Sequence, residues 1–411
     1  MSAEPRPCTG SEERAALGAL RAWRPPLCPG EPVLESCTAI DGYIAASGYA
    51  CGSRIQAATT PEGGEAEETP GWASLVALAM LPPPFTGASV EGAPRPASLE
   101  RSWRGPTGFS TVWLTSRGSP ALLRARRVAA DSPLEPVVLG YLNASGYRWA
   151  PRLYGYTLLG DELYSTYREW LPGTPLAALR GPELSAALEL LGSALRGLHE
   201  ALAGCGDPLC SPEPGEPGDA ERWMYRLEYR VSILERLAEL GARVPEAALE
   251  ALERLAGEVA PLAEAAAGFD KQRVHGDPHL HNALLHAGGV YIVDYSGEPF
   301  REPAGPLEKE PRQRDLAVVL RSLHYLHELG VPSAYPGLAS AFLAAYGGCG
   351  GRLGAEATAF WMVERASYEA VYEALTSSGL EGVPAAALEA MASGADPLYT
   401  RLAGGHCPGG R

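Results

Sequence analysis

The chain has 411 residues, of which 46% are hydrophobic and 20% charged, a composition typical of a globular protein with two or three domains. Its formal net charge of -15 argues against nucleic acid or an anionic membrane as a partner, since either would need a basic face. The eight cysteines form no Cys-x-x-Cys pair, which argues against a zinc site, and a secreted disulfide scaffold of this length is not expected.

The beginning of the sequence lacks the basic and apolar regions of a signal peptide. The longest apolar run, near residues 72–82, is too short to cross a membrane. We therefore expect a cytoplasmic protein, with a monomer as the expected state.

Residues 1–100 carry the weakest pattern in the chain. Short apolar pieces alternate with stretches rich in glycine, proline and glutamate, and residues 61–68 are typical of an acidic loop. We predict a small β-rich or α+β cap subdomain over residues 1–100.

Residues 101–172 carry patterns typical of strands, with one helix among them. We predict that they form a nucleotide-binding lobe. The predicted elements are strands at 110–115 and 121–125, a helix over 135–144, and strands near 153–156 and 164–167.

Beyond residue 172 the pattern becomes helical, and we predict that residues 173–411 form a large helical lobe. Leucines at four- and three-residue spacing from Leu184 to Leu202 give one apolar stripe, which ends at Gly204. Further helices are predicted over 219–241, over 245–267 with Pro245 in the first turn, from 315 onward, and over 355–376.

The strongest chemical signal is the loop around Asp277. Asp277, Asn282 and Asp294 follow one another in the order and spacing used by the phosphoryl-transfer site of protein kinases. There the first aspartate accepts the proton of the attacking hydroxyl, while the asparagine and the second aspartate hold Mg²⁺ on the nucleotide phosphates. Residues 283–286 and 290–293 are predicted to pair as a hairpin that returns Asp294 to the site. We therefore expect ATP and Mg²⁺ as cofactors, in an α+β, two-lobe, protein-kinase-like fold.

The nucleotide phosphates are expected to meet residues 105–111, where Gly108 and Ser110 offer a close backbone approach and a hydroxyl. An ordinary Gly/Pro-rich turn is the alternative. The next strand should carry a cation, and because no lysine occurs in the first half of the chain, the candidate is Arg124, oriented by Glu135. A solvated edge of arginines is the alternative for this strand.

Glu169 and Trp170 fall where the chain is expected to pass from the strand-rich lobe to the helical lobe. Backbone groups at such a hinge can bond adenine. Both residues are therefore predicted to belong to the nucleotide site.

Three later segments add to the catalytic loop: residues 294–299 read Asp-Tyr-Ser-Gly-Glu-Pro, residues 314–317 read Arg-Asp-Leu-Ala, and residues 368–373 read Tyr-Glu-Ala-Val-Tyr-Glu. Over most of residues 105–385 the chain resembles the maltokinases, a branch of the aminoglycoside-phosphotransferase-like kinases. The corresponding maltokinase motifs are Asp-Phe-Glu-Gly-Glu-Pro, Arg-Asp-Val-Ala and Tyr-Glu-Val-Val-Tyr-Glu.

The resemblance implies that Asp277 is the catalytic base and that Asp294 is a Mg²⁺ ligand. The chain departs from the family's pattern at three positions. Asn282 replaces the family's usual glutamine, Arg124 its lysine and Tyr295 its phenylalanine. The arginine puts nucleotide affinity or rate in doubt, because arginine is longer and bulkier than lysine.

On the substrate side we expect His279, Glu298 and Asp315. His275 and His279 could also act as bases, but for both we favour a structural role, in which the rings bond loop carbonyls and fix the backbone that aims Asp277. A helix cap is the alternative for Asp315, whose charge would suit the start of a helix.

Glu364, Tyr368 and Tyr372 follow at four-residue spacing and so share one face of the last long helix. The resemblance implies that the two tyrosines line a sugar site, where aromatic rings cover the apolar face of a pyranose. An interhelical hydrogen-bond patch is the alternative.

The expected function is an ATP-dependent sugar kinase that phosphorylates maltose at its anomeric hydroxyl. A kinase for glucosamine, another amino sugar or an aminoglycoside is the nearest alternative, since the acidic chain would suit a cationic acceptor. A non-catalytic pseudokinase that binds nucleotide or sugar is the alternative from another class, suggested by the missing lysine alone.

Overall fold

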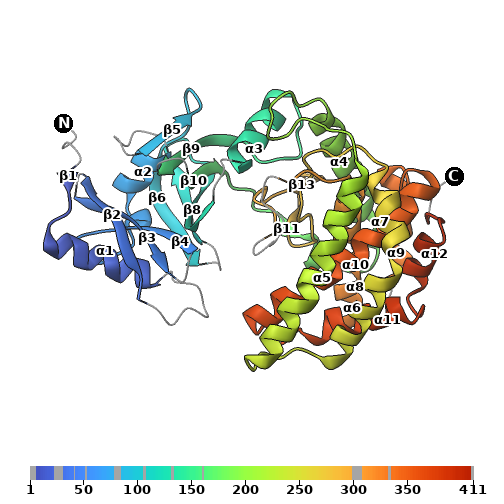
Figure 1. The fold of residues 1–411 in the computed structure, drawn as a ribbon. Helices are drawn as coiled ribbons and strands as arrows, with labels where there is room; N and C mark the ends of the chain where they lie inside the picture. The colour runs from blue at the N-terminus through green and yellow to red at the C-terminus, as the bar shows by residue number, and fades with distance from the viewer. Residues whose placement is uncertain are drawn as a thin grey trace. The chain divides into compact units, whose positions relative to one another are not determined.

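The computed structural model describes residues 6–22, 31–40, 42–50, 53–77, 85–104, 108–130, 134–159, 162–298, 308–331 and 335–408. Residues 105–107 of the predicted phosphate segment lie outside the described residues. The chain divides into two compact units, one of Met1–Asn143 with Pro151–Leu171 and one of Ala144–Ala150 with Pro172–Arg411 (Figure 1).

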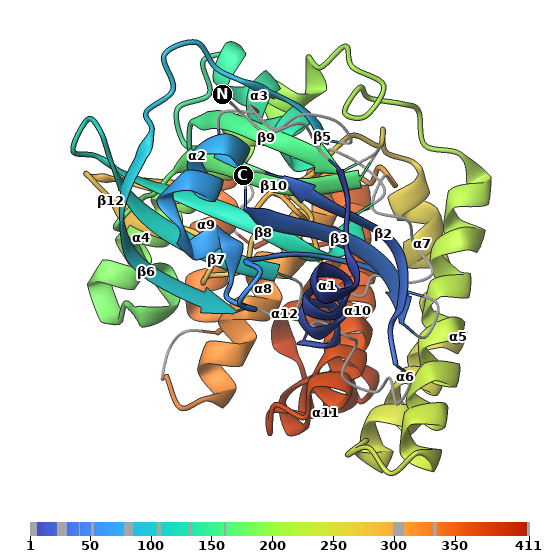
Figure 2. The same ribbon diagram turned by 90° about the vertical axis from the view of Figure 1, so that its left-hand side faces the viewer.

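The first unit is built on a 10-stranded sheet with the strand order β1-β2-β3-β4-β8-β10-β9-β5, to which β7 is attached through β8 and β6 through β7 (Figure 2). Its helices are α1 (Gly10–Ala22), α2 (Pro70–Ala77) and α3 (Leu134–Ala144). Its strands are β1 (Arg6–Pro7), β2 (Val33–Ile40), β3 (Tyr43–Ala50), β4 (Ser53–Thr59), β5 (Phe85–Ser89), β6 (Pro96–Arg104), β7 (Gly108–Thr115), β8 (Pro120–Ala130), β9 (Leu153–Leu159) and β10 (Glu162–Glu169).

Two hydrophobic clusters cover opposite faces of β3, because successive side chains of a strand point to opposite faces. Ile44 and Ala46 pack with Leu20 of α1. Ala45, between them, belongs to a second cluster around Trp72 of α2, which also holds side chains of β7, β8 and β10. The first hundred residues thus share a core with the strands that follow, while their role as a separate cap subdomain remains a prediction.

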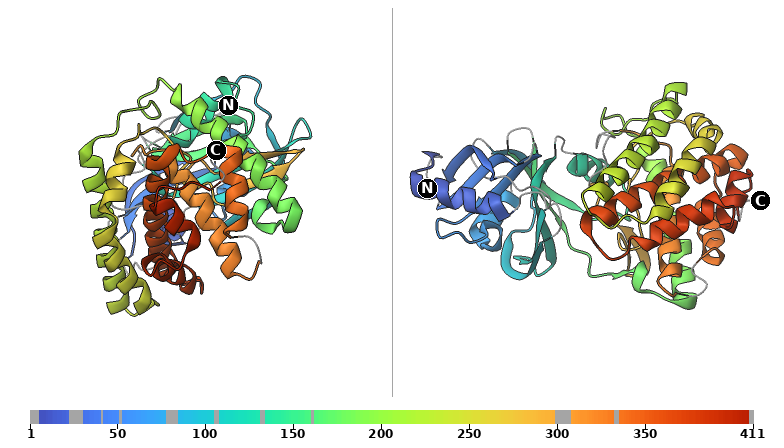
Figure 3. Two further views of the ribbon diagram at one scale, coloured as in Figure 1. Left: turned by 90° about the vertical axis from the view of Figure 1, so that its right-hand side faces the viewer. Right: turned by 60° about the horizontal axis from the view of Figure 1, so that its bottom comes forward.

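In the second unit α10 (Gly351–Thr376) packs against α5, α7, α8, α11 and α12, while α4 packs against α9 (Figure 3). Most side chains of α10 are buried, as expected for a central helix. The other α-helices of the second unit are α4 (Gly181–Ala203), α5 (Pro217–Glu239), α6 (Glu246–Glu258), α7 (Ala260–Ala267), α8 (Gln313–Glu328), α9 (Gly337–Tyr346), α11 (Gly382–Ala392) and α12 (Pro397–Ala403). None of the helices in the described ranges combines the length and apolarity needed to span a membrane.

A small three-stranded sheet of β11 (Thr174–Pro175), β12 (Ala283–His286) and β13 (Gly289–Ile292) contains the predicted hairpin. Ala287 and Gly288 both have positive φ, 47° and 77°, as a two-residue type I′ turn requires. At Gly289 a Cβ atom would lie 2.0 Å from a ring carbon of Trp149, so only glycine allows this ring to pack there. The hairpin that returns the chain to Asp294 is confirmed.

One predicted helix is corrected. The span 245–267 contains two helices, α6 and α7, which meet at Val259. Pro261 explains the break, because proline has no N–H and its ring clashes with the carbonyl four residues earlier. It is instead accommodated in the first turn of α7. Pro245, predicted to lie inside the helix, is the residue that precedes α6.

Disulfides join three pairs of described cysteines: Cys8–Cys37, Cys205–Cys210 and Cys349–Cys407. Sequence spacing did not indicate them, because two of the pairs join residues 29 and 58 positions apart. The last pair ties the segment after α12 to the residues that lead into α10.

We expect the substitution Cys349→Ser to lower the free energy of unfolding by about 2–4 kcal/mol, because it releases a long loop in the unfolded chain. Urea unfolding of C349S, C407S and the double variant measures the effect. The double variant should lose no more than either single variant, since all three lack the same bond. Additive losses would contradict a shared origin in the disulfide.

Candidate active site

The loop that carries Asp277 is anchored by the carboxylate of Asp315, which lies in α8 and is fully buried. The two oxygens of Asp315 accept hydrogen bonds from the backbone N–H groups of His275 and Gly276, each at 2.8 Å. The prediction of a substrate contact for Asp315 is therefore corrected, and so is the alternative of a helix cap. The side chain holds the catalytic loop instead.

A buried histidine completes the surroundings of Asp315. His199 of α4 places Nε2 2.8 Å from Oδ2 of Asp315 and Nδ1 2.8 Å from the hydroxyl of Tyr346. Burial by itself would raise the pKa of Asp315, but the hydrogen bond and charge of His199 outweigh it and lower that pKa. The anchor therefore stays ionised.

His275 fixes the backbone next to Asp277, as its structural alternative predicted. Its Nδ1 accepts a hydrogen bond from the N–H of Asp277 at 3.2 Å. The proton of the neutral ring therefore lies on Nε2, which donates to the carbonyl of Val293 at 3.1 Å. Burial lowers the pKa of His275, so the ring is kept in this neutral form.

Asp277 presents its two carboxylate oxygens to different neighbours. Oδ1 lies 2.9 Å from Nη1 of Arg365 in α10, an ion pair without the alignment of a hydrogen bond. Oδ2 lies 3.5 Å from Nε2 of His279. The N–H of His281 donates to Nδ1 of His279, so a neutral ring carries its proton on the nitrogen that faces Asp277. His279 thus lies beside the predicted base and is partly exposed.

Asn282 and Asp294 are brought together by the end of the hairpin, because the N–H of Val293 donates to the carbonyl of Asn282 at 2.9 Å. The amide nitrogen of Asn282 donates to the carbonyl of Asp277 at 3.0 Å, which leaves the amide oxygen as its atom for a metal. Asp294 has a left-handed backbone, with φ 67°, a strain often found at functional sites. This pair of oxygen donors fits Mg²⁺, which binds through few protein oxygens plus substrate phosphates.

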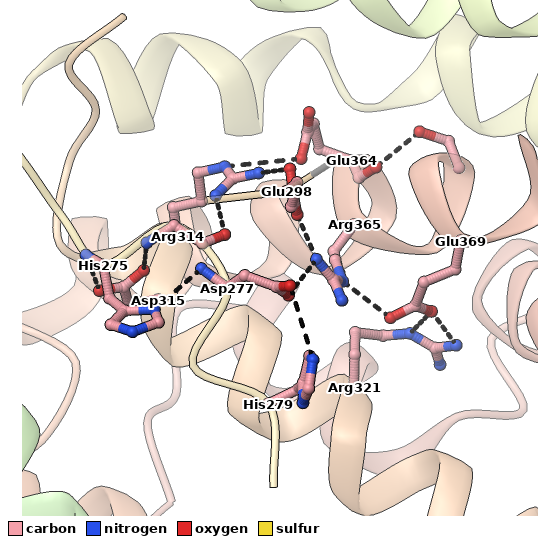
Figure 4. Close-up of polar contacts among 12 residues, drawn as sticks. His275, Asp277, His279, Glu298, Arg314, Asp315, Arg321, Glu364, Arg365 and Glu369 are labelled. Atoms are coloured by element: carbon pink, nitrogen blue, oxygen red, sulfur yellow. Dashed lines mark hydrogen bonds and ion pairs between the residues drawn. The ribbon is translucent and has the colours of Figure 1, made fainter. Parts of the chain in front are cut away.

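Arg365 is the central cation of the site, and the sequence reasoning missed it. Its guanidinium faces three carboxylates: Asp277, Glu298 and Glu369, the last through an Nε–Oε1 distance of 3.0 Å (Figure 4). Burial opposes its charge, but the three carboxylates outweigh burial and raise the pKa of Arg365 well above the ordinary value. The only signal in the sequence was the four-residue spacing from Glu369 on a helix.

Glu298 was expected on the substrate side. Its side chain is fully buried and forms ion pairs with Arg314 and Arg365. This placement corrects the expectation: the carboxylate holds two arginines next to the catalytic loop.

Further buried ion pairs connect α5, α8 and α10. Arg314 donates to the carbonyl of Gly276 at 2.6 Å and lies 3.0 Å from Glu310. Arg226 joins Glu310, at 2.9 Å, to Glu364, at 3.0 Å. Glu364 is therefore part of an interhelical patch, the alternative left open for it, and is fully buried.

Tyr368 and Tyr372 stack on each other, with ring centroids 6.0 Å apart. The guanidinium of Arg365 lies over the ring of Tyr368, 4.9 Å from its centroid. Burial raises the pKa of Tyr368, and the charges of Glu298 and Asp277 raise it further. Tyr372 is only partly buried, and Asp277 contributes to its raised pKa after burial and Glu373.

In the first unit, Ser110 lies opposite Arg124 in the β7–β8 register. Gly108 is required by packing, because a Cβ atom there would lie 2.4 Å from the carbonyl oxygen of Ala125.

The expected pairing of Glu135 with Arg124 is corrected. Glu135 is buried and forms ion pairs with Arg126, at 3.1 Å, and Arg168, at 3.5 Å. Arg126 lies two residues beyond Arg124 and therefore projects from the same face of β8.

At the predicted hinge, the backbone N–H of Glu169 donates to the carbonyl of Arg152, which ties this end of β10 to the residues before β9. Trp170 packs edge-on against Trp103, with ring centroids 5.9 Å apart, and Arg101 lies over its ring at 4.6 Å. Trp103 was not predicted as part of this group.

Comparison with protein families matches residues 104–356, more than half of the chain, to APH, the phosphotransferase enzyme family. The chain belongs to this family. The predicted α+β, protein-kinase-like fold with its strand-rich and helical parts is confirmed.

Among solved structures, the chain is similar to a glucosamine kinase in complex with glucosamine, ADP and inorganic phosphate. The two share 19% sequence identity and a TM-score of 0.65 over 95% of this chain and 100% of that chain. A second glucosamine kinase structure, crystal form A, matches with 20% identity and a TM-score of 0.64 over 90% of this chain and 94% of that one. Both likenesses include part of the first hundred residues, because no more than about a tenth of the chain lies outside them.

We expect His324 to make stability dependent on pH. Arg321, which pairs with Glu369, also donates to Nδ1 of His324 at 2.8 Å. Burial, followed by the charge of Arg321, lowers the pKa of His324 to about 3 from 6.5. The unfolded chain therefore takes up this proton first, so the stability contribution is complete above pH 6.5 and falls as the pH decreases toward 3.

The substitution His324→Asn keeps an acceptor for Arg321 and removes the titration. We expect it to flatten the pH dependence of the free energy of unfolding by up to about 1.4 kcal/mol per pH unit below the ordinary histidine pKa. Urea unfolding between neutral pH and about pH 4 measures the slope. An unchanged slope would show that His324 is not the group responsible.

Proposed function

We propose that the protein is an ATP- and Mg²⁺-dependent sugar kinase in which Asp277 is the catalytic base. The observation that carries the proposal is the convergence of Asp277, Asn282 and Asp294 at one loop and the end of one hairpin. Membership of a phosphotransferase family supports the reaction class.

In the proposed reaction the oxygen of an acceptor hydroxyl bonds to the γ-phosphorus, and the bond from that phosphorus to the β-phosphate oxygen breaks, releasing ADP. The hydroxyl proton passes to Asp277. The loop positions this carboxylate through three fixed points on its backbone: Asp315 holds His275 and Gly276, and His275 holds the N–H of Asp277. Such positioning supplies much of the rate in phosphoryl transfer, where little covalent work is required of the protein.

Asn282 and Asp294 are the proposed Mg²⁺ ligands, and the bound ion would neutralise charge on the phosphates. For the nucleotide we propose Gly108, Ser110, Glu169 and Trp170, as expected from the sequence. The geometry of Glu135 adds Arg126 to Arg124 as a cation for the phosphates.

The acceptor is proposed to be a neutral sugar, with maltose first. Tyr368 and Tyr372 offer stacked aromatic rings in the field of Asp277. The other two carboxylates that face Arg365, Glu298 and Glu369, are already paired with arginines, an arrangement that favours hydroxyl groups over an ammonium. The motifs shared with maltokinases favour maltose among neutral sugars.

Glucosamine is the second candidate acceptor. It is supported by the fold similarity to a glucosamine kinase, which spans nearly the whole of both chains.

An acceptor panel distinguishes these proposals. ADP release with Mg²⁺-ATP is measured over maltose, glucose, glucosamine, trehalose and an aminoglycoside. We expect maltose to give the highest kcat/KM. Turnover with glucosamine alone would replace the maltose proposal, and ATP binding without turnover of any acceptor would favour a pseudokinase.

We expect Asp277→Asn to lower kcat by about 100-fold or more, because the acceptor hydroxyl loses its base. Nucleotide binding, measured by calorimetry with Mg²⁺-ADP, should stay within about twofold, since the predicted metal ligands are untouched. Asp270→Asn, an exposed aspartate shortly before the loop, is the matched control and should leave kcat unchanged. Full activity of the Asp277 variant would disprove the base assignment.

A further inference from the structure

We propose that Arg365 is a positioning residue for the catalytic base, which holds Oδ1 of Asp277 so that Oδ2 receives the acceptor proton. The inference rests on the proposed kinase function and adds a residue to it. It comes from the geometry around one guanidinium, in a helix far along the chain from the catalytic loop.

The contact is direct. Nη1 of Arg365 lies 2.9 Å from Oδ1 of Asp277, and both side chains are almost completely buried. The other oxygen, Oδ2, faces the partly exposed ring of His279 at 3.5 Å. Of the two oxygens, Oδ1 is the one paired with Arg365 and Oδ2 is the one beside His279, so Oδ2 is left to receive the proton (Figure 4).

Arg365 is itself held from two other directions. Glu298 binds the same Nη1 nitrogen that faces Asp277, and Glu369 binds Nε at 3.0 Å. Both partners are held in turn, Glu298 by Arg314 and Glu369 by Arg321 at 2.7 Å. The carboxylates on its other sides limit how far the guanidinium can turn, so its charge stays beside Oδ1 of Asp277.

The residue type matters. A planar guanidinium can serve several carboxylates through nitrogens that point in different directions, whereas the ammonium of lysine is a single point charge. The ring of Tyr368 lies under the guanidinium, 4.9 Å from Cζ, and adds a flat surface that suits arginine. Lysine at this position would keep the charge and lose part of the alignment.

The same arrangement links the base to the proposed sugar site. Tyr368 is three residues from Arg365 on α10, so one helix carries both the group that orients Asp277 and the ring proposed to meet the acceptor. A shift of α10 would therefore move Tyr368 and the arginine that contacts Asp277 together.

The test compares kcat, KM and nucleotide affinity for Arg365→Met, Arg365→Lys and Arg226→Met with an acceptor that the unsubstituted protein turns over. Arg226 is the matched control, because it is buried in the neighbouring ion pairs and contacts Glu308, Glu310 and Glu364. We expect Arg365→Met to lower kcat by about 100-fold, with nucleotide affinity within about twofold, because a displaced base costs rate rather than binding.

Arg365→Lys should retain more activity than Arg365→Met, with kcat reduced by about tenfold, since the charge remains and the fork is lost. Arg226→Met should lower the unfolding temperature and leave kcat within about threefold. Thermal unfolding and nucleotide binding show that each variant is folded at the assay temperature. The lysine variant also tests the inference where the methionine variant fails to fold.

A double-mutant cycle separates positioning from a general structural role. If Arg365 acts through Asp277, the substitution Arg365→Met should cost less than about threefold in the residual kcat of an Asp277→Asn protein. A full further loss of about 100-fold in that background would overturn the inference. So would equal kcat values for Arg365→Met and the unsubstituted protein, or an equal loss in Arg226→Met.

The outcomes also distinguish the inference from the function on which it rests. Turnover by the unsubstituted protein with an Arg365→Met variant of normal kcat overturns the inference and leaves the proposed kinase intact. Absence of turnover by the unsubstituted protein with every acceptor overturns both.

Discussion

The active site depends on one buried carboxylate, that of Asp315. Its oxygens accept the N–H groups of His275 and Gly276, and its remaining partner is His199. A buried charge is costly unless it is paired and hydrogen-bonded, and here two of the bonds that stabilise the charge also fix the loop before Asp277. These bonds tie the first turn of α8 to the loop before Asp277.

Arginine side chains add further bonds between this loop and the helices. Arg314 binds the carbonyl of Gly276, so the loop is held by a donor as well as by an acceptor from adjacent residues of α8. Replacing such buried ion pairs by apolar side chains is often neutral or favourable for stability, which makes stability alone a poor explanation for them. Their directional bonds fix how α5, α8 and α10 pack together, and two of the arginines, Arg314 and Arg365, also reach the loop of Asp277.

The elements whose signals are local in sequence could be predicted. The leucine stripe predicted α4 and its end at Gly204, the strand patterns around the turn at 287–289 predicted the hairpin, and the spacing of Asp277, Asn282 and Asp294 indicated the reaction class. The partners of Asp315 could not be predicted, because a carboxylate in the first turn of a helix looks the same whether it caps the helix or reaches a loop 40 residues away. Arg365 was hidden for the same reason: its partners come from distant segments, and the cysteine pairs likewise form only in the folded chain.

The arginine that replaces the usual nucleotide lysine is compatible with phosphate binding. Glu135 pairs with two guanidinium groups, those of Arg126 and Arg168. A guanidinium can bind Glu135 through one nitrogen and still direct other N–H donors toward phosphate oxygens. Glu135 pairs with Arg126 and not with Arg124. The two arginines are two residues apart, so they project from the same face of β8. The missing lysine is therefore weak evidence for a pseudokinase, because Arg126 of β8 and Glu135 of α3 form a cation–carboxylate pair of the kind expected beside the nucleotide phosphates.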